Sequence, residues 1–191
     1  MPRDNRFRNF TCILYPDSAG SEEEVCRKIN AYHIPAFLSP LHEGDPHSPE
    51  FEGKPHWHLM FMFPGKKAPE DVFEIFDSLN GVRPEIVQSV GGMARYLCHL
   101  DEHDKNKYSP SDVKCFAGAD YTEMCTTQAD LVIAMQGIIS YIDYYKIMFY
   151  HQLLKQLLAD NESYLFRMCC FSCAIPVKEY LRSKWSKQKE A

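Results

Sequence analysis

The run His-Trp-His-Leu-Met-Phe-Met-Phe occupies residues 56–63 and decides how the chain folds. It is rich in aromatic and long apolar side chains, and Pro64-Gly65 follows it, so the pattern predicts a β-strand that stops at the proline. Successive side chains of a strand point to opposite faces of the sheet. One face carries His56, His58, Met60 and Met62. The other face carries Trp57, Leu59, Phe61 and Phe63, and we expect it to be the core under the helices.

The segments around this strand predict an α+β fold. Further strands are expected at 7–15, 34–38 and 85–90. One helix is expected to begin at a capping box at Ser21 and to run to Tyr32. A second is expected over 69–79, with Gly81 as the stop signal. A third is expected over 93–100, after a turn at Gly91-Gly92. This order indicates a ferredoxin-like central antiparallel sheet covered on one face by helices.

The character of the chain changes after residue 125. Residues 101–125 read as polar and irregular, and helical periodicity with few glycines or prolines begins near 126. Helices are expected over 128–158, 162–173 and 176–187. We therefore expect two domains, an α+β domain over 1–125 and a small all-α domain over 126–191.

Composition limits the classes of function. The 191 residues carry a formal net charge of −5; residues 1–125 hold 13 Lys/Arg and 20 Asp/Glu, a net −7, and residues 126–191 hold 8 and 6, a net +2. A nucleic-acid partner would therefore need local basic patches and a divalent cation. The longest uncharged stretches are shorter than the roughly 20 residues that span a bilayer, so no transmembrane helix is expected. Eight cysteines without paired CxxC motifs indicate free thiols in a reducing cytoplasm.

The histidines of 56–63 suggest a metal site. Two residues on one strand face, two positions apart, have Cα atoms about 6.5–7 Å apart, so His56 and His58 can converge on one ion. The strand expected at 34–38 can lie beside 56–63, and the loop His42-Glu43-Gly44-Asp45 follows it. This loop adds an imidazole and a carboxylate, for which we choose Asp45, with Glu43 as the alternative. A mixed nitrogen and oxygen set suits Mn²⁺ and can accommodate Mg²⁺ or Zn²⁺. The alternative is a pair of half-exposed surface histidines beside a solvated loop.

Tyr96 is the candidate nucleophile. We expect it one turn into a short helix that follows a strand of the sheet, and a phenol near a metal-bound phosphate can form a covalent phosphodiester with the enzyme. The alternative is that Tyr96 packs like most of the eleven tyrosines. Tyr141 and Tyr144 form another possible nucleophile pair, but a core or subunit contact explains them better.

Four ordered motifs resemble those of a known family. They are Phe10-Thr-Cys-Ile-Leu-Tyr-Pro-Asp-Ser18, Ser39-Pro-Leu-His-Glu-Gly-Asp45, His56-Trp57-His58-Leu59 and Tyr96-Leu-Cys-His99. Together they resemble the opening strand, metal loop, histidine–hydrophobic–histidine (HUH) strand and nucleophile helix of rolling-circle plasmid replication initiators. The resemblance is closest to the RepB-type initiators and covers roughly residues 8–125.

The resemblance implies roles for particular residues. His42, Asp45, His56 and His58 would hold Mn²⁺ or Mg²⁺. Tyr96 would attack the scissile phosphate of single-stranded or hairpin DNA at the plasmid origin, retain the 5′ phosphate and leave a 3′-OH for the host replication machinery. The helical domain 126–191 would form a homo-oligomer. The protein would act in the bacterial cytoplasm without a membrane partner.

Local basic patches would have to supply the DNA contacts. Ten of the 13 basic residues in the first domain are candidates for such patches, namely Arg3, Arg6, Arg8, Lys54, Lys66, Lys67, Arg83, Arg95, Lys105 and Lys107. We single out Arg95 as a phosphate contact and Lys66 and Lys67 as backbone contacts, against the alternative of solvated faces. Two other functions stay open: a conjugative mobilisation relaxase that uses the same chemistry, and a non-catalytic ferredoxin-like module that binds nucleic acid.

Overall fold

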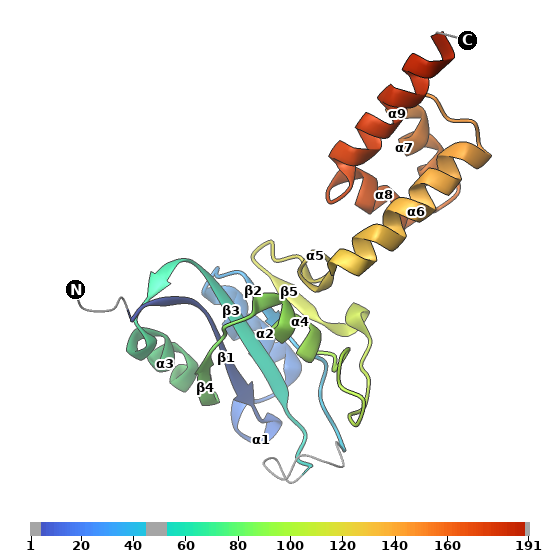
Figure 1. Cartoon of the computed structure of the whole chain (residues 1–191). Helices are drawn as coiled ribbons and strands as arrows, with labels where there is room; N and C mark the ends of the chain where they lie inside the picture. Colours follow the sequence, from blue (N-terminus) through green and yellow to red (C-terminus); the bar gives the residue numbers. More distant parts are fainter. Residues whose placement is uncertain (1–4, 45–52, 190–191) are drawn as a thin grey trace. The chain divides into compact units, whose positions relative to one another are not determined.

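The computed structural model describes residues 5–44 and 53–189 and divides into two compact units, Met1–Cys125 and Thr126–Ala191 (Figure 1). Each unit has a hydrophobic core of its own. All eight cysteines are free thiols. Among the described residues, the structure has no helix long and apolar enough to cross a membrane.

The first unit is built on a five-stranded sheet in which all neighbouring strands are antiparallel (Figure 1). The strands lie in the order β4-β1-β3-β2-β5. Their bounds are β1 (Phe7–Leu14), β2 (Ala36–Leu38), β3 (Trp57–Lys67), β4 (Val82–Ile86) and β5 (Lys114–Phe116).

Two helical crossovers connect the first four strands. Helix α2 (Glu22–Ala31), preceded by the short α1 (Pro16–Ala19), joins β1 to β2, with β3 between them. Helix α3 (Pro69–Ser78) joins β3 to β4, with β1 between them. These two interleaved βαβ units confirm the predicted ferredoxin-like α+β fold. The predicted capping box is also present, because the Ser21 hydroxyl accepts from the Glu24 N–H and the Glu24 carboxylate accepts from the Ser21 N–H.

Alternation along β3 is as predicted on the helix-covered side of the sheet. The main core joins this face of β3 to β1, α2 and α3, and it includes Phe10, Trp57, Leu59, Phe61, Phe63, Ile29 and Phe76. The expectation that helices cover one face alone is wrong. A second core on the histidine side includes Phe37, Met60, Ala94, Leu97, Val113 and Tyr121. Helices α4 (Val90–Tyr96) and α5 (Tyr121–Cys125) supply part of it.

Several segments of the first unit differ from the sequence prediction. Strand β3 continues through Pro64 to Lys67. Its pairing with β1 shifts register between Asn9 and Phe7, and at such an irregularity Pro64 is tolerated because no backbone N–H has to donate to the neighbouring strand there. Strand β4 begins at Val82 rather than at 85, since it lies at the edge of the sheet, where Pro84 is tolerated. Residues 101–125 are not simply irregular, because they contain a 3₁₀ turn (Pro110–Asp112), β5 and α5.

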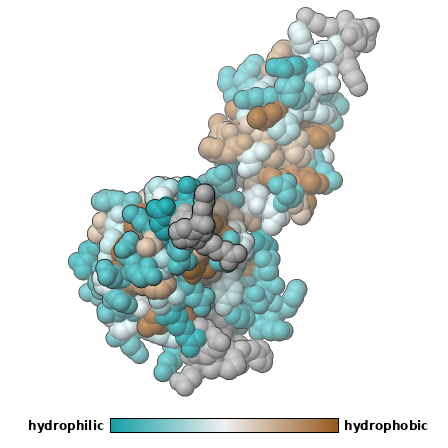
Figure 2. All heavy atoms as spheres, turned by 60° about the vertical axis from the view of Figure 1, so that its left-hand side comes forward, coloured by the Kyte–Doolittle hydropathy of each residue, from teal (hydrophilic) through white to brown (hydrophobic). Residues whose placement is uncertain are grey.

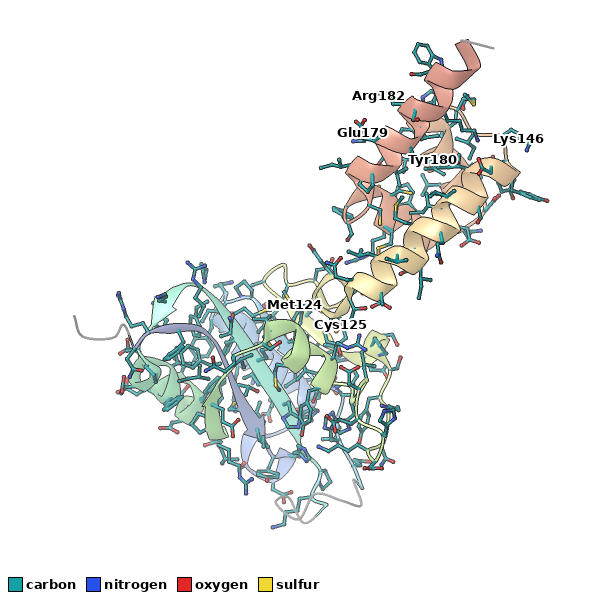
Figure 3. All side chains as sticks on the ribbon, viewed as in Figure 1. Met124, Cys125, Lys146, Glu179, Tyr180 and Arg182 are labelled. Carbon is teal, nitrogen blue, oxygen red and sulfur yellow. The ribbon has the colours of Figure 1, made fainter. Side chains whose placement is uncertain are left out.

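The second unit contains four helices within the described residues: α6 (Gln128–Tyr144), α7 (Tyr150–Ala159), α8 (Ser163–Cys170) and α9 (Ala174–Lys189). A single helix over 128–158 is therefore wrong. The break follows α6 near Lys146, which takes a left-handed φ of 54° (Figure 3). A capping box between Thr127 and Asp130 begins α6. Near the other end of this helix, the Tyr180 hydroxyl of α9 donates to Asp143.

The surface of the helical unit carries apolar side chains, visible as brown atoms in Figure 2. The most exposed of the large ones are Val132, Ile133, Tyr144, Leu158, Phe171 and Ile175.

Candidate active site

Three predicted histidines meet on the second face of the sheet. His42 follows β2 and continues its antiparallel pairing with the β3 segment, because His42 and His56 exchange two backbone hydrogen bonds of 2.8 and 3.1 Å. The ring centroids are 5.3 Å apart for His42 and His56, and 5.0 Å apart for His58 and each of the other two. All three side chains are buried. The prediction that the 34–38 strand lies beside the HUH strand is confirmed by the pairing of β2 with β3.

The cluster is compact enough for its side chains to converge on one metal ion. The candidate ligand nitrogens of His42, His56 and His58 all lie within 4.8 Å of one another. Three nitrogens bound to one ion at about 2.1 Å are separated by about 3.0–3.4 Å in octahedral or tetrahedral geometry. The rings therefore need to close by up to about 1.8 Å to share an ion.

Backbone carbonyls orient two of the three rings. The Nε2 of His42 is hydrogen-bonded to the Leu97 carbonyl at 3.0 Å, and the Nδ1 of His56 to the Lys54 carbonyl at 2.8 Å. A carbonyl on one ring nitrogen is the usual partner of a histidine that binds metal through the other nitrogen. Burial and the nearby imidazoles of His42 and His56 hold the pKa of His58 well below its ordinary value, so this ring is in the neutral form that a metal requires.

The carboxylate ligand is not placed by the structure. Asp45 lies outside the described residues. Glu43, the alternative, has an exposed side chain and is not part of the histidine cluster. Its backbone N–H donates to the Tyr108 hydroxyl at 2.9 Å, and Tyr108 stacks on the His42 ring at 4.3 Å. The start of the predicted metal loop is thereby attached to the cluster.

Tyr96 lies beside the histidines. It is the last residue of α4 rather than one turn into a helix over 93–100, because Ser89 caps this helix by accepting from the Gly92 N–H and both glycines fall inside it. The Tyr96 ring centroid is 5.3 Å from that of His58. The Lys105 ammonium donates to the Tyr96 hydroxyl at 2.7 Å.

Two further side chains lie beside Tyr96, and neither was singled out from the sequence. His99 is buried, and its ring lies 4.3 Å from His42 and 5.2 Å from Tyr96. It takes a left-handed φ of 51° just after α4, which turns the chain back toward the cluster. Its spacing of three residues from Tyr96 in the predicted helix was a signal that could have found it. Lys105 was one of ten basic residues considered together, and only the fold of the 97–109 segment brings it to Tyr96.

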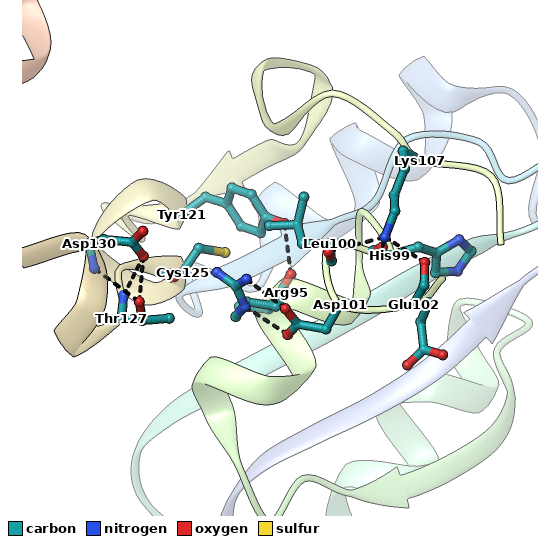
Figure 4. Close-up of polar contacts among 11 residues, drawn as sticks. Arg95, His99, Leu100, Asp101, Glu102, Lys107, Tyr121, Cys125, Thr127 and Asp130 are labelled. Atoms are coloured by element: carbon teal, nitrogen blue, oxygen red, sulfur yellow. Dashed lines mark hydrogen bonds and ion pairs between the residues drawn. The ribbon is translucent and has the colours of Figure 1, made fainter. Parts of the chain in front are cut away.

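The predicted DNA contacts are dispersed. Arg95 binds Asp101 through two hydrogen bonds of 2.7 and 2.6 Å and also donates to the Cys125 carbonyl, so it braces the end of α4 (Figure 4). Lys66 and Lys67 are exposed at the far end of β3, eight and nine residues from His58, which corresponds to on the order of 25 Å along a strand. The structure does not bring these three residues together with the histidines.

A cavity of about 230 Å³ opens next to Tyr96. His58 and Tyr96 form part of its wall, and Thr11, Arg83 and Glu85 add polar groups from β1 and β4. A phosphate group with its neighbouring sugar or base could therefore approach the Tyr96 oxygen from this side.

Comparison with known proteins places this site in a family. A family model described as the origin-binding domain of plasmid replication proteins matches residues 2–122, which include the three histidines and Tyr96. The chain belongs to this family. The match confirms the resemblance to plasmid replication initiators that the four sequence motifs indicated.

Relatives extend the similarity beyond this plasmid replication protein's first unit. The chain is 31% identical over 182 residues to a replication protein of Staphylococcus aureus. This alignment covers 95% of the chain and 90% of the relative. It is 28% identical over 189 residues to the replication protein RepB of Lactiplantibacillus plantarum, in an alignment that covers 97% of this chain and 84% of the relative. Both matches include the helical unit.

Proposed function

We propose that this replication initiator binds the origin DNA of its plasmid and nicks one strand by attack of Tyr96 on a phosphate. One observation carries the proposal: the Tyr96 ring lies 5.3 Å from His58 in a cluster of three buried histidines suited to a divalent ion. A phenol beside a site that can bind a phosphoryl oxygen is suited to covalent catalysis.

The reaction exchanges one phosphodiester for another. The Tyr96 oxygen bonds to phosphorus while the bond from phosphorus to the 3′ oxygen breaks. The phenol loses its proton to solvent and the 3′ oxygen gains one, so the products are a 5′-phosphotyrosine and a free 3′-OH. The reverse reaction, in which a 3′-OH attacks the phosphotyrosine, rejoins the strand. Because a phosphodiester is present on both sides, the reaction consumes no nucleotide cofactor.

Mn²⁺ or Mg²⁺ is the proposed cofactor. His42, His56 and His58 would hold it, with Asp45 as the proposed carboxylate ligand. A divalent ion bound there would polarise the phosphoryl oxygen and offset negative charge in the transition state. The carbonyl partners of His42 and His56 keep these two imidazoles oriented. Burial keeps the His58 ring neutral.

The remaining partners follow from this chemistry. The released 3′-OH would prime synthesis by the host replication machinery in the bacterial cytoplasm, where the plasmid is copied. We propose that the helical unit forms a homo-oligomer. Its exposed apolar side chains, among them Tyr144, Phe171 and Ile175, support this role, since such side chains commonly mark protein interfaces.

Oligonucleotides that tile the plasmid origin, each with a different label at either end, test the reaction. With Mn²⁺, we expect the 3′-end label to become covalently bound to protein and the 5′-end label to be released on a fragment that a polymerase can extend. Tyr96→Phe should abolish both products. Tyr144→Phe is the matched control, because this tyrosine is exposed in the helical unit, and it should cleave like the unmodified protein. Unchanged cleavage by Tyr96→Phe contradicts the assignment of the nucleophile.

The metal is tested separately. EDTA should stop cleavage and added Mn²⁺ should restore it, while His58→Ala should neither cleave nor bind Mn²⁺ in a calorimetric titration. A protein that binds the origin hairpin but never cleaves it, with or without Mn²⁺, would be a non-catalytic binding module.

A further inference from the structure

Lys105 is in direct contact with the proposed nucleophile. Its ammonium donates a hydrogen bond of 2.7 Å to the Tyr96 hydroxyl. The same nitrogen lies 4.5 Å from the centroid of the Tyr96 ring. The lysine comes from the loop after α4, nine residues beyond Tyr96, so the contact depends on how this loop folds back.

The two residues that follow Lys105 anchor the loop. The Lys107 ammonium donates to the backbone carbonyls of His99, Leu100 and Glu102, just past the end of α4 (Figure 4). The Asn106 carbonyl is hydrogen-bonded to the His99 ring at 2.9 Å. The Asn106 side chain also donates to the Glu43 carbonyl at 3.2 Å, which links the loop to the metal loop. These contacts set the position of the Lys105 backbone before any substrate binds.

We propose that Lys105 is a catalytic residue that acts on the Tyr96 oxygen in both directions of the reaction, an inference that rests on the nicking function proposed above. In cleavage, the Lys105 ammonium keeps the oxygen aimed at the phosphate and offsets the negative charge that this oxygen carries as its proton leaves to solvent. In rejoining, the same oxygen is the leaving group, and the ammonium offsets the charge that returns to it. The lysine keeps its own protons throughout.

This role differs from that of a lysine that binds the DNA backbone. A phosphate contact contributes to affinity and leaves the chemical step alone, whereas a donor to the reacting oxygen changes the rate. Removing one such preorganised donor typically lowers a rate by roughly 10²-fold or more. By microscopic reversibility, the loss should be similar for cleavage and for rejoining.

The test compares Lys105→Met, Lys105→Arg and Lys114→Met under single turnover with Mn²⁺ and an origin hairpin. Lys114→Met is the matched control, because it removes the same charge from the first unit, while the Lys114 ammonium pairs with Glu22 rather than with Tyr96. We expect Lys105→Met to cleave and to rejoin roughly 10²-fold more slowly, with hairpin affinity within about twofold of the unmodified protein. Lys105→Arg, which keeps the charge, should lose less, and Lys114→Met should match the unmodified protein. The unchanged affinity shows that Lys105→Met is folded.

A second substrate identifies the oxygen on which Lys105 acts. A hairpin with sulfur in place of the bridging 3′ oxygen has a leaving group that needs no help from an acid. If Lys105 acts on the Tyr96 oxygen, the deficit of Lys105→Met persists with this substrate. Recovery of the rate would show that the lysine acts on the 3′ oxygen and would overturn the inference, as would weaker hairpin binding with an unchanged rate. If the unmodified protein forms no Tyr96-dependent adduct, the nicking function itself fails, and the inference fails with it.

Discussion

Gly81 shows how one residue can be required for a reason that its sequence context does not reveal. The sequence predicts it as the left-handed residue that ends α3, but Asn80 takes that conformation, with a φ of 58°. Gly81 is the next residue, and its N–H donates to the Phe76 carbonyl at 2.8 Å. A Cβ on Gly81 would lie 2.8 Å from the Cys12 sulfur and 3.0 Å from the Phe76 carbonyl oxygen. The glycine is therefore needed for close packing of the α3 end on β1.

Gly81→Ala should lower the free energy of unfolding by about 1–3 kcal/mol, because an extra carbon must displace a buried sulfur and a backbone oxygen. Urea denaturation measures this change. Gly65→Ala is the control, since a Cβ on Gly65 would meet no atom of the described residues within 4 Å, and it should stay within about 0.5 kcal/mol. Equal effects from the two substitutions would contradict the steric explanation.

The buried His58 ring makes the metal-free protein sensitive to acid. Its pKa in the folded chain lies well below the value near 6.5 of an unfolded chain, so below about pH 6.5 the unfolded chain binds a proton that the folded chain does not. Stability should therefore fall as the pH drops from about 6.5 toward the folded pKa, by up to about 1.4 kcal/mol per pH unit from this group. Urea denaturation in EDTA at pH 7.5 and 5.5 measures the loss, which should be smaller in His58→Gln. The same loss in both proteins would contradict this origin of the acid sensitivity.

At the scale of the elements, α4 connects the sheet to the candidate site. Its first turn contains Gly91 and Gly92, which are poor helix formers, and its N-terminus depends on the Ser89 hydroxyl. The Tyr121 hydroxyl donates to the Ala94 carbonyl at 2.7 Å and fixes the helix against α5 (Figure 4). Tyr96 ends this helix, so the cap at one end helps to hold the proposed nucleophile at the other.

Ser89→Ala should lower the free energy of unfolding of the first unit by about 1 kcal/mol, since it removes the acceptor for the Gly92 N–H. Thermal denaturation followed by circular dichroism measures it. Ser186→Ala is a suitable control, because this exposed serine lies within α9 and donates to its own helix at the Arg182 carbonyl. The capping role would be refuted by a Ser89→Ala protein as stable as the control.

The sequence predicts the elements whose signals are local and misses those that depend on distant contacts. The alternation of 56–63, the Ser21 capping box and the pairing of β2 with β3 were all predicted, and with them the meeting of three histidines. The three residues of β5 were not, because they form a strand only by pairing with β2, whose partner residues lie 76 to 80 positions earlier in the chain. Lys105 belongs to the same class, since no periodic pattern places a loop lysine on Tyr96.

On the scale of the whole molecule, each unit buries its own apolar residues. The first unit has cores on both faces of its sheet, and the second has a core formed by α6 to α9, which includes Ile138, Ile142, Leu153, Leu157 and Val177. A unit with its own core can fold independently. The division therefore separates the candidate site from the helical unit.

We expect a fragment of residues 1–125 to unfold cooperatively on heating and to bind Mn²⁺ as the full chain does. Circular dichroism and calorimetric titration measure the two properties. The fragment 126–191 serves as a comparison, because it should be helical but should not bind Mn²⁺ at this site. A disordered 1–125 fragment would show that its cores do not suffice.

His56 and His58 face one side of the sheet, and Trp57, Leu59 and Phe61 face the main core on the other, so one short segment serves both the candidate metal site and the folding of the first unit. Inserting one residue between His56 and His58 would put the two imidazoles on opposite faces, because successive side chains alternate and the rest of β3 keeps its pairing with β1 and β2. One imidazole would then enter the apolar layer beneath α2 and α3. Single-residue insertions at this point should therefore be lost from a library selected for plasmid maintenance.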